Sequence, residues 1–473
     1  MSEEEVVVGA DIGTKTSVVA GIESGNAFVV DIALDSKTAN TNNLFDEAGN
    51  CLISVRDLSN LRKGDIIIEH FKPFMGRTYP ADGYLEDDIR RWNSSCHINE
   101  QGYPVYPVRG DNVRPEQSYA LQIRFLAQRY QKQTHKTPTR FVLAVPAYWP
   151  SPRRQAVLDA VSIAGYTKGT VIITEPVAAV IGTTKKHPDI KGTDFVCIDI
   201  GGGTTDVALI HVNDERTLFI VEDTAGDNEL GGEHFTMALV DVCKGKMKGT
   251  EVAEHKLRHA CEMAKTSGRY PMEIQLNDES SIKVTKSEYK DACQEILKRL
   301  GNVIDEVFKK KKDVKVIIVG GAFRDEVIFE YCKKKIGRGK FIPPYSLSTP
   351  VAEGAAWVGQ PNSGIVVIDS LHQNIGIESQ NLSKGKTDKF NVVLKRGQGI
   401  PTEFNTDEHN YEYFGAPGGE THLKIFQGDR KTASQNVHLF TYKFACPAGA
   451  GIPLLSQLIL SNYLGGNGAD QSL

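Results

Sequence analysis

The sequence predicts an α/β protein in which a large duplicated domain precedes a smaller β-rich domain. Three observations predict this class. A strand–turn–strand pattern at residues 10–22 recurs at residues 198–210. Apolar strand segments alternate with helical segments as far as about residue 360. From residue 372 onward, the chain changes to short alternating segments separated by Gly, Asn and Pro, which is typical of antiparallel sheets.

The duplication rests on an internal repeat, ADIGTKTSVVAGI at 10–22 and IDIGGGTTDVALI at 198–210. The same separation along the chain relates every matched pair, namely Asp11 with Asp199, Gly13 with Gly201, and Thr16 with Thr204. An apolar strand follows each turn, so both units are predicted to be hairpins. The stretch GADIGTKT also resembles the phosphate loop G-x-x-x-x-G-K-[ST]. That alternative is disfavoured because the spacing is one residue short and no helix follows.

Two of the helices predicted between the repeats have start signals in the sequence. Residues 115–133 have helical spacing, with Pro115 in the first turn. The second helix begins after a cap at Ser151, has Pro152 at its first position and stops at Gly165. Strands are predicted in alternation with these and later helices, at RFVLAVPA (140–147), in TVIITEPVAAVIG (170–182, strand into helix) and in 315–337 (strand, Gly-Gly turn, helix).

The smaller domain is predicted from alternating segments such as FNVVLKRG (390–397), THLKIFQGD (421–429) and VHLFTYKFAC (437–446). The final stretch, NYLGGNGADQSL, is expected to be a frayed tail.

Composition limits the partners and the compartment. The formal net charge of −4 over 473 residues gives no electrostatic reason to expect nucleic acid or an acidic membrane as a partner. The basic run 309–312 is interpreted as the solvated end of a helix. The eight scattered cysteines are expected to be reduced core residues. The N-terminal stretch MSEEE is acidic where a signal peptide would be basic, and no apolar run approaches about 18 residues, so a reducing, cytoplasmic location is expected.

The two repeated turns have a composition that suits a metal-bound polyphosphate. Glycine lets the backbone approach phosphate oxygens, and successive amides in such turns form an anion-binding concavity. Acids beside these turns would repel phosphate unless a divalent cation intervenes, and carboxylates such as Asp11 and Asp199 can orient the waters of Mg²⁺. The alternative is that the glycines mark tight turns and the aspartates cap them. The repetition of the pattern favours the phosphate interpretation.

The chain resembles the heat shock protein 70 chaperones of the actin-like ATPase superfamily. The motifs that carry the resemblance are GADIGTKTS, VPAYWPSPRRQAVLDAVSIAG, TEPVAA, DIGGGTTDVAL, GDNELGGEHF, ACEMAK and IVGGAFR, in order from about residue 6 to 460. The resemblance implies a duplicated actin-like (ribonuclease H-like) ATPase domain at 6–363 and an interdomain linker at 364–371. It also implies a truncated, β-sandwich-like substrate-binding domain without a helical lid at 372–460, and a tail at 461–473.

The resemblance also implies the site residues. Catalysis is assigned to Lys72, Glu175, Asp199, Asp206 and Thr204. Mg²⁺ is held through water by Asp11, Glu175 and Asp199, and K⁺ is a further candidate cation. ATP or ADP is contacted by Thr204 as well, and by Gly13, Thr14, Lys15, Gly201, Gly202, Gly203, Gly231, Gly232, Glu262, Lys265, Gly320, Gly321 and Arg324. Without the resemblance, Glu262 and Lys265 would be an ordinary surface ion pair.

Pro146 and Arg154 match a proline switch and its arginine, which relay the nucleotide state to the second domain in the family. Several residues depart from the family pattern, namely Lys15 in the first turn, Pro73 after the lysine, and Thr266, Arg269 and Ala322 in the adenosine pocket. These departures put nucleotide affinity in question. Gln380 and Thr421 would make the peptide pocket polar and weaken its capture of apolar peptides.

The leading hypothesis is a lidless Hsp70-like chaperone with weak ATPase activity that partners stimulate. The expected partners are unfolded or nascent polypeptide, a J-domain co-chaperone, a nucleotide exchange factor and a ribosome-associated complex. The alternative is an ATP-binding scaffold or regulatory subunit of a chaperone complex. A small-molecule kinase on the same fold is disfavoured because the linker and the β domain resemble chaperone parts.

Overall fold

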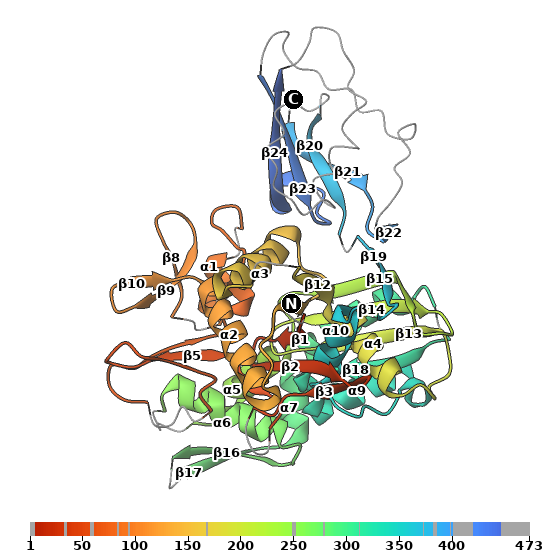
Figure 1. Ribbon diagram of the computed structural model, residues 1–473. Coiled ribbons are helices and arrows are strands. Elements are labelled where there is room, and N and C mark those ends of the chain that lie inside the picture. Colours follow the sequence, from red (N-terminus) through yellow and green to blue (C-terminus); the bar gives the residue numbers. More distant parts are fainter. Residues whose placement is uncertain are drawn as a thin grey trace. The chain divides into compact units, whose positions relative to one another are not determined.

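The protein, described by a computed structural model, divides into two compact units (Figure 1). The larger holds residues 1–149 and 153–367, and the smaller holds residues 150–152 and 368–473. The structure describes residues 5–32, 36–56, 61–82, 85–92, 95–166, 169–247, 252–277, 280–311, 313–371, 373–381, 386–397, 399–400 and 420–445.

Two sheets organise the larger unit. The first has the order β12-β11-β1-β2-β3, with β4 also paired to β2, and the second contains β18-β13-β14-β15 in that order. The strands of the first sheet are β1 (Val7–Ile12), β2 (Thr16–Glu23), β3 (Asn26–Val29), β4 (Ala39–Asn40), β11 (Arg140–Val145) and β12 (Val171–Thr174). Those of the second are β13 (Asp194–Ile200), β14 (Thr205–Val212), β15 (Leu218–Asp227) and β18 (Lys315–Val319).

The two repeats are antiparallel hairpins, as predicted, and the structure shows that they also share the same register. Gly9 lies opposite Ala20 in β1–β2, and their counterparts in the repeat, Cys197 and Ala208, lie opposite each other in β13–β14. In each sheet the first strand of the hairpin also pairs in parallel, β1 with β11 and β13 with β18. A strand follows each turn, so the phosphate-loop alternative is wrong.

The predicted helices form, with one change at a boundary. Helix α2 (Pro115–Thr134) begins at Pro115. Helix α3 (Ser151–Ala164) includes Ser151 as its first residue, one position earlier than the predicted cap allowed. The other helices are α1 (Leu85–Arg91), α4 (Glu175–Lys186), α5 (Gly232–Lys246), α6 (Glu254–Thr266), α7 (Lys286–Ala292), α8 (Gln294–Phe308), α9 (Glu326–Ile336) and α10 (Pro350–Gly359), with the 3-10 turns η1 (Lys72–Phe74), η2 (Gly321–Arg324) and η3 (Arg338–Lys340).

Short sheets complete the larger unit. They are β6-β5-β7, β10-β9-β8 and the hairpin β16–β17. Their strands are β5 (Asn42–Phe45), β6 (Cys51–Ile53), β7 (Ile66–Glu69), β8 (His97–Ile98), β9 (Pro104–Val108), β10 (Asp111–Val113), β16 (Met272–Asn277) and β17 (Ser280–Val284).

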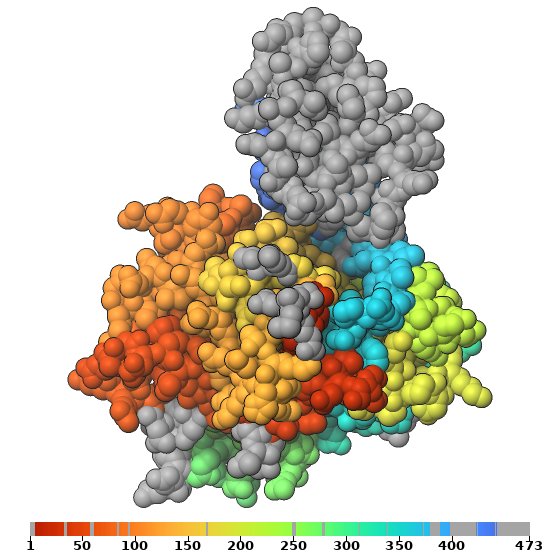
Figure 2. Space-filling model, viewed as in Figure 1, coloured from red at the N-terminus to blue at the C-terminus, as the bar shows by residue number. Residues whose placement is uncertain are grey.

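Helix α10 packs closely against α4 and the first sheet. A Cβ atom at Gly354 would lie 1.8 Å from the carbonyl oxygen of Ala178 in α4, so only glycine allows the two helices to approach this closely. In Figure 2 cyan atoms, the colour of the segment that includes α10, lie beside the red N-terminal segment. This packing holds α4, whose first residue is Glu175, against the strands that carry the turns.

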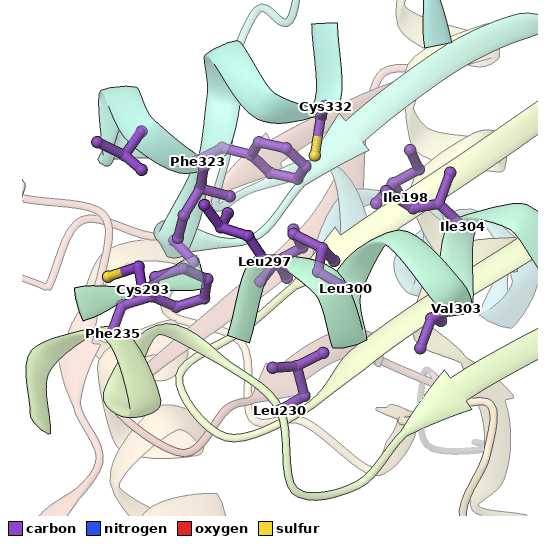
Figure 3. Packing of buried hydrophobic residues seen from close by; sticks show 14 of the residues in the cluster. Ile198, Leu230, Phe235, Cys293, Leu297, Leu300, Val303, Ile304, Phe323 and Cys332 are labelled. Carbon is purple, nitrogen blue, oxygen red and sulfur yellow. The ribbon is translucent and has the colours of Figure 1, made fainter. Parts of the chain in front are cut away.

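A large hydrophobic core of the described residues includes strands of the second sheet. It joins β13, α5, α8, η2 and α9, and Figure 3 shows residues from each of them, including Ile198, Phe235, Leu297, Phe323 and Cys332.

Of the seven cysteines in the described part of the chain, all are free and all but Cys51 are buried. This agrees with the expectation of reduced core cysteines, although Cys446 lies outside the described residues. In the described part of the chain, no helix has the length and apolarity needed to cross a membrane.

The range predicted as a linker contains β19 (Val366–Ser370). Its first residue, Val366, donates its backbone N–H to the carbonyl oxygen of Thr217 at 2.7 Å. Its last two residues, Asp369 and Ser370, pair with β22 (Gly399–Ile400). The segment 366–370 is therefore an extended strand and not an irregular connection.

The smaller unit contains an antiparallel sheet of order β21-β20-β23-β24. Its strands are β20 (Ile375–Asn381), β21 (Lys386–Leu394), β23 (Glu420–Gln427) and β24 (Val437–Ala445), with the 3-10 turn η5 (Ala433–Gln435). Phe390, Phe426 and Ala433 form a small buried cluster. The predicted alternating segments are therefore strands. The predicted tail 461–473 and the side chains of Gln380 and Thr421 lie outside what the structure describes.

Candidate active site

The two hairpin turns close with the same hydrogen bond. The backbone N–H of Gly13 donates to the carbonyl oxygen of Thr16 at 2.9 Å. At the equivalent place, Gly201 donates to Thr204 at 3.0 Å. In each hairpin this hydrogen bond closes a tight turn at the end of the first strand, close to Asp11 in one hairpin and to Asp199 in the other.

The second turn lies against the first. A Cβ atom at Gly202 would lie 2.8 Å from Cγ of Lys15, and one at Gly203 would lie 3.1 Å from the hydroxyl of Thr14. Bare backbone is needed in the second turn because side chains of the first turn occupy the space beside it.

A cleft in the larger unit brings most of the predicted residues together. The sequence-predicted residues that line it are Asp11, Gly13, Thr14, Lys15, Lys72, Glu175, Asp199, Gly201, Gly202, Thr204, Gly232, Glu262, Lys265, Gly320, Gly321 and Arg324. Of the predicted set, Gly203, Gly231 and Asp206 do not line it. Of the pocket departures, Thr266 and Ala322 line the cleft and Arg269 does not.

A buried ion pair lies at the acidic end of this cleft. Lys72, at the start of η1, places its Nζ atom 2.7 Å from Oε1 of Glu175, and the two side chains are only 4% and 8% exposed. Glu175 is the first residue of α4. Asp11 and Asp199 come from the ends of β1 and β13.

The acids of this cluster outnumber the cations. Burial, then the charge of Glu175, raises the pKa of Asp11 to about 7. The same two causes, with Asp11 and Asp206 beside it, raise the pKa of Asp199 well above its ordinary value. Lys72 lowers the pKa of both acids but does not offset these effects. Such a cluster is stabilised by a further cation, and carboxylate oxygens are the donors that Mg²⁺ prefers.

Asp206 lies behind the cleft, directly across the hairpin from Asp199. Its Oδ1 atom accepts a hydrogen bond from the backbone N–H of Tyr148 at 3.0 Å. Burial and the charge of Glu175 raise the pKa of Asp206 to about 7. The acid therefore connects the second hairpin to the segment that follows Pro146.

Two neighbouring arginines hold this segment and the lysine. Arg154, which the resemblance singled out, donates to the carbonyl oxygens of Trp149 and Ala147, both at 3.0 Å. Arg153, which sequence reasoning missed, is buried and donates to the carbonyl oxygens of Lys72 and Pro73 at 3.1 and 3.0 Å. Arg153 thus positions the backbone of the lysine itself.

The N-terminus of α5 closes the second turn. Gly232 and Glu233 donate their backbone N–H groups to the carbonyl oxygens of Gly201 and Gly202, both at 2.9 Å. A Cβ atom at Gly231 would lie 2.7 Å from the backbone of Gly202 and Gly203, which places Gly231 behind the turn.

Helix α6 supplies the opposite wall. Lys265 is 2% exposed, and its ammonium donates to the carbonyl oxygen of Gly232 and the hydroxyl of Thr236, both at 2.7 Å. It also pairs with Glu262 at 3.1 Å. Lys265 and Glu262 therefore belong to a hydrogen-bonded network with Gly232 and Thr236, and they are not an ordinary surface ion pair.

Lys15 has a partner that sequence reasoning missed. Its Nζ atom lies 2.6 Å from Oε2 of Glu233, which also pairs with Arg258. Although burial opposes the charged form, Lys15 and Arg258 hold the pKa of Glu233 below its ordinary value. The only sequence signal for Glu233 is its place directly after two glycines that open a helix.

Gly320 and Gly321 form the last wall. Gly320 has a φ of +98°, and a Cβ atom there would lie 2.2 Å from the carbonyl oxygen of Ile200 and 2.6 Å from Oδ1 of Asp199. Arg324 donates to the hydroxyl of Ser348 at 3.3 Å. Ser348, Leu347, Val351 and Asp325 also line the cleft and were not predicted.

A search of protein-family models matches residues 7–455 to the model described as Hsp70 protein. The chain belongs to the Hsp70 family. The heat shock cognate HSP70 protein of Trypanosoma brucei brucei is 28% identical over 96% of this chain and 71% of its own length. The DnaK chaperone proteins of two strains of Thermus thermophilus are each 26% identical over 94% of this chain and 75% of their own length.

Family membership gives this Hsp70-like chaperone its general chemistry. Hsp70 proteins are ATPases that bind ATP or ADP with Mg²⁺ and act on unfolded polypeptides with co-chaperones. The mixed α/β architecture of the larger unit fits the actin-like ATPase fold. The paired turns, the excess of buried carboxylates and the bare backbone at Gly320 fit a metal-bound nucleotide in the cleft.

Proposed function

We propose that the cleft of this Hsp70-like chaperone binds Mg–ATP and hydrolyses it slowly, with stimulation by partner proteins. The observation that carries this proposal is the arrangement of two equivalent turns against each other beside Asp11, Glu175, Asp199 and Lys72. Backbone amides of both turns and the hydroxyls of Thr14 and Thr204 bind the phosphates.

The acids and the lysine have complementary roles in the proposed mechanism. Asp11, Glu175 and Asp199 hold the waters of Mg²⁺, which when bound neutralises phosphate charge. Lys72 directs its ammonium to the γ-phosphate and the attacking water. Asp199, with Asp206 directly across the hairpin from it, is proposed to act near that water, where a carboxylate oxygen orients the water and accepts its proton. K⁺ is proposed as a further counter-ion.

The nucleoside lies between two walls in this proposal. Glu262 and Lys265 from α6 form one wall, and Gly320, Gly321 and Arg324 form the other. Gly203 and Gly231 support the nucleotide site indirectly, because their lack of a side chain lets the second turn pack against its neighbours. Lys15 exchanges Glu233 for a phosphate oxygen when the nucleotide binds, since its ammonium lines the cleft.

The smaller unit is proposed to contact polypeptide or a co-chaperone, with a β-sandwich-like arrangement and a linker at 364–371. Pro146 and Arg154 would relay the nucleotide state, a role supported by the hydrogen bonds that join this segment to Asp206 and Arg154. J-domain proteins, exchange factors and ribosome-associated complexes are the proposed partners, in a reducing cytoplasm.

A non-catalytic, ATP-binding scaffold is the second candidate. The observation that favours it is the ion pair between Lys15 and Glu233. The ammonium of Lys15 lies at the phosphate-binding turn, and this ion pair would have to break before Lys15 could contact a phosphate. Such a protein would bind ATP without turnover and act through its partners.

Single-turnover hydrolysis of ATP distinguishes the two candidates. We expect a slow wild-type rate that Lys72→Ala lowers about 100-fold or more, since electrostatic groups at a phosphoryl-transfer site contribute on this scale. The matched control is Lys132→Ala, which removes an exposed lysine of α2 and leaves the rate unchanged. A wild-type protein that binds ATP but gives no product would favour the scaffold.

A further inference from the structure

We propose that a lysine-rich groove formed by α7, α8 and α9 is a docking site for an acidic peptide segment of a partner protein. The groove lies within the larger unit and shares no lining residue with the nucleotide cleft. Six lysines line it, namely Lys286, Lys290, Lys298, Lys333, Lys334 and Lys335.

The charge of the groove opposes that of the whole chain. Only two acids, Glu295 and Glu330, are among its lining residues. The chain as a whole has a formal charge of −4. Six lysines against two lining acids leave an excess of positive charge in the groove, which attracts a carboxylate-rich segment.

The lysines of the groove are available for a new partner. Lys290 and Lys334 are exposed, and their side chains form no ion pair with another described residue. The other four make surface ion pairs, such as Lys286 with Glu326 at 2.9 Å and Lys335 with Asp305 at 2.8 Å. Pairs of this kind contribute little to stability, so an incoming carboxylate can replace them.

The floor of the groove is apolar. Leu297 and Val327 line it and are each 4% exposed, and Figure 3 shows Leu297 as part of the core. At Gly301 a Cβ atom would lie 2.2 Å from the hydroxyl oxygen of Tyr331, so glycine lets this ring lie against α8. An apolar floor with a cationic rim fits a peptide in which acidic and apolar residues alternate.

The lining favours a peptide over nucleic acid. Tyr331 is the one aromatic residue among the described lining residues, and none of them is an arginine. Single-stranded nucleic acid is generally bound by several aromatic rings that stack on its bases. The groove offers ammonium groups and aliphatic surface instead.

Fluorescence anisotropy on the full chain tests this proposal. The probe is a fluorescein-labelled peptide that alternates glutamate with leucine. We expect the double variant Lys290→Glu/Lys334→Glu to weaken binding about tenfold or more, because like charges then face the peptide. The matched control, Lys63→Glu/Lys132→Glu, makes the same net charge change at exposed lysines elsewhere and leaves binding unchanged.

Two further measurements make the result specific. Binding is expected to fall steeply as NaCl rises from about 0.05 to 0.5 M, since salt screens exposed charges. It is also expected to be the same with and without ATP. Equal binding by the double variant and the wild type would overturn the proposal. So would equal binding of a lysine–leucine peptide, or tighter binding of a single-stranded oligonucleotide through the same lysines.

Discussion

The hairpins β1–β2 and β13–β14 share the same backbone arrangement but carry different side chains. Their registers and their turn hydrogen bonds coincide at equivalent positions of the repeat. The first turn carries the side chains of Thr14 and Lys15, whereas the second has Gly202 and Gly203. The comparison teaches that the two hairpins share a backbone arrangement, and that their turns pack together because the second turn has no side chains at Gly202 and Gly203.

The strands that follow the turns differ at the position opposite the aspartate of each hairpin. Val18 lies opposite Asp11, and the equivalent residue opposite Asp199 is Asp206. Val18 is 1% exposed, as is Asp206. The second hairpin therefore carries a buried acid where the first carries an apolar residue, so the two halves are not interchangeable in the proposed chemistry.

The largest effect is expected when the first hairpin is given the acid of the second. Val18→Asp would bury a carboxylate beside Asp11, and the free energy of unfolding is expected to fall by about 3 to 5 kcal/mol. Chemical denaturation measures this change. The control is Val18→Ile, which stays apolar, and a Val18→Asp variant as stable as wild type would contradict the comparison.

Removing the charge of the acid in the second hairpin should separate its effect on stability from its effect on the reaction. Asp206→Asn keeps an acceptor for the N–H of Tyr148 but removes the charge, and the single-turnover rate is expected to fall about 30- to 100-fold. ATP affinity should change little, because Asp206 does not line the cleft. An unchanged rate would show that the acid is structural, as its valine counterpart is.

The packing of the turns gives a smaller and reversible effect. Gly202→Ala places a methyl group 2.8 Å from Cγ of Lys15, and ATP affinity is expected to fall about tenfold, or about 1.4 kcal/mol. Removing the obstructing side chain in Gly202→Ala/Lys15→Gly should recover part of this loss. Calorimetric titration with ATP measures both. No coupling between the two substitutions would mean that the turns do not constrain each other.

The smallest effect is expected at a glycine without close neighbours. Gly245 lies in α5, and apart from its chain neighbours and the backbone of its own helix, no atom lies within 4 Å of a Cβ placed there. Gly245→Ala is therefore expected to stabilise the protein by about 0.5 to 1 kcal/mol through helix propensity, without a change in ATP affinity. A lower unfolding temperature for this variant would show that the free space around a glycine does not by itself predict the effect of replacing it with alanine.

The two hairpins and the order of strands and helices could be predicted from the sequence, because the repeat and the alternation of strands and helices are visible as patterns along the chain. The sequence was not sufficient for the contacts. Lys72 and Glu175 are 103 residues apart, and only the family resemblance joined them before the structure did. Helical periodicity did not indicate that Arg153, beside the predicted Arg154, holds the lysine segment. The partner of Lys15, Glu233, lies on a helix in the other half of the duplicated domain, so no local pattern links the two.

The central claim is that both turns and their acids form one site for metal-bound ATP. The most direct test is the ATP affinity of the wild type and of Asp11→Asn and Asp199→Asn, each measured with Mg²⁺ and with EDTA. The account predicts that Mg²⁺ tightens binding in the wild type, and that either substitution, one in each hairpin, removes most of this gain. Wild-type affinity that does not depend on Mg²⁺, or a dependence that both variants retain in full, would contradict it.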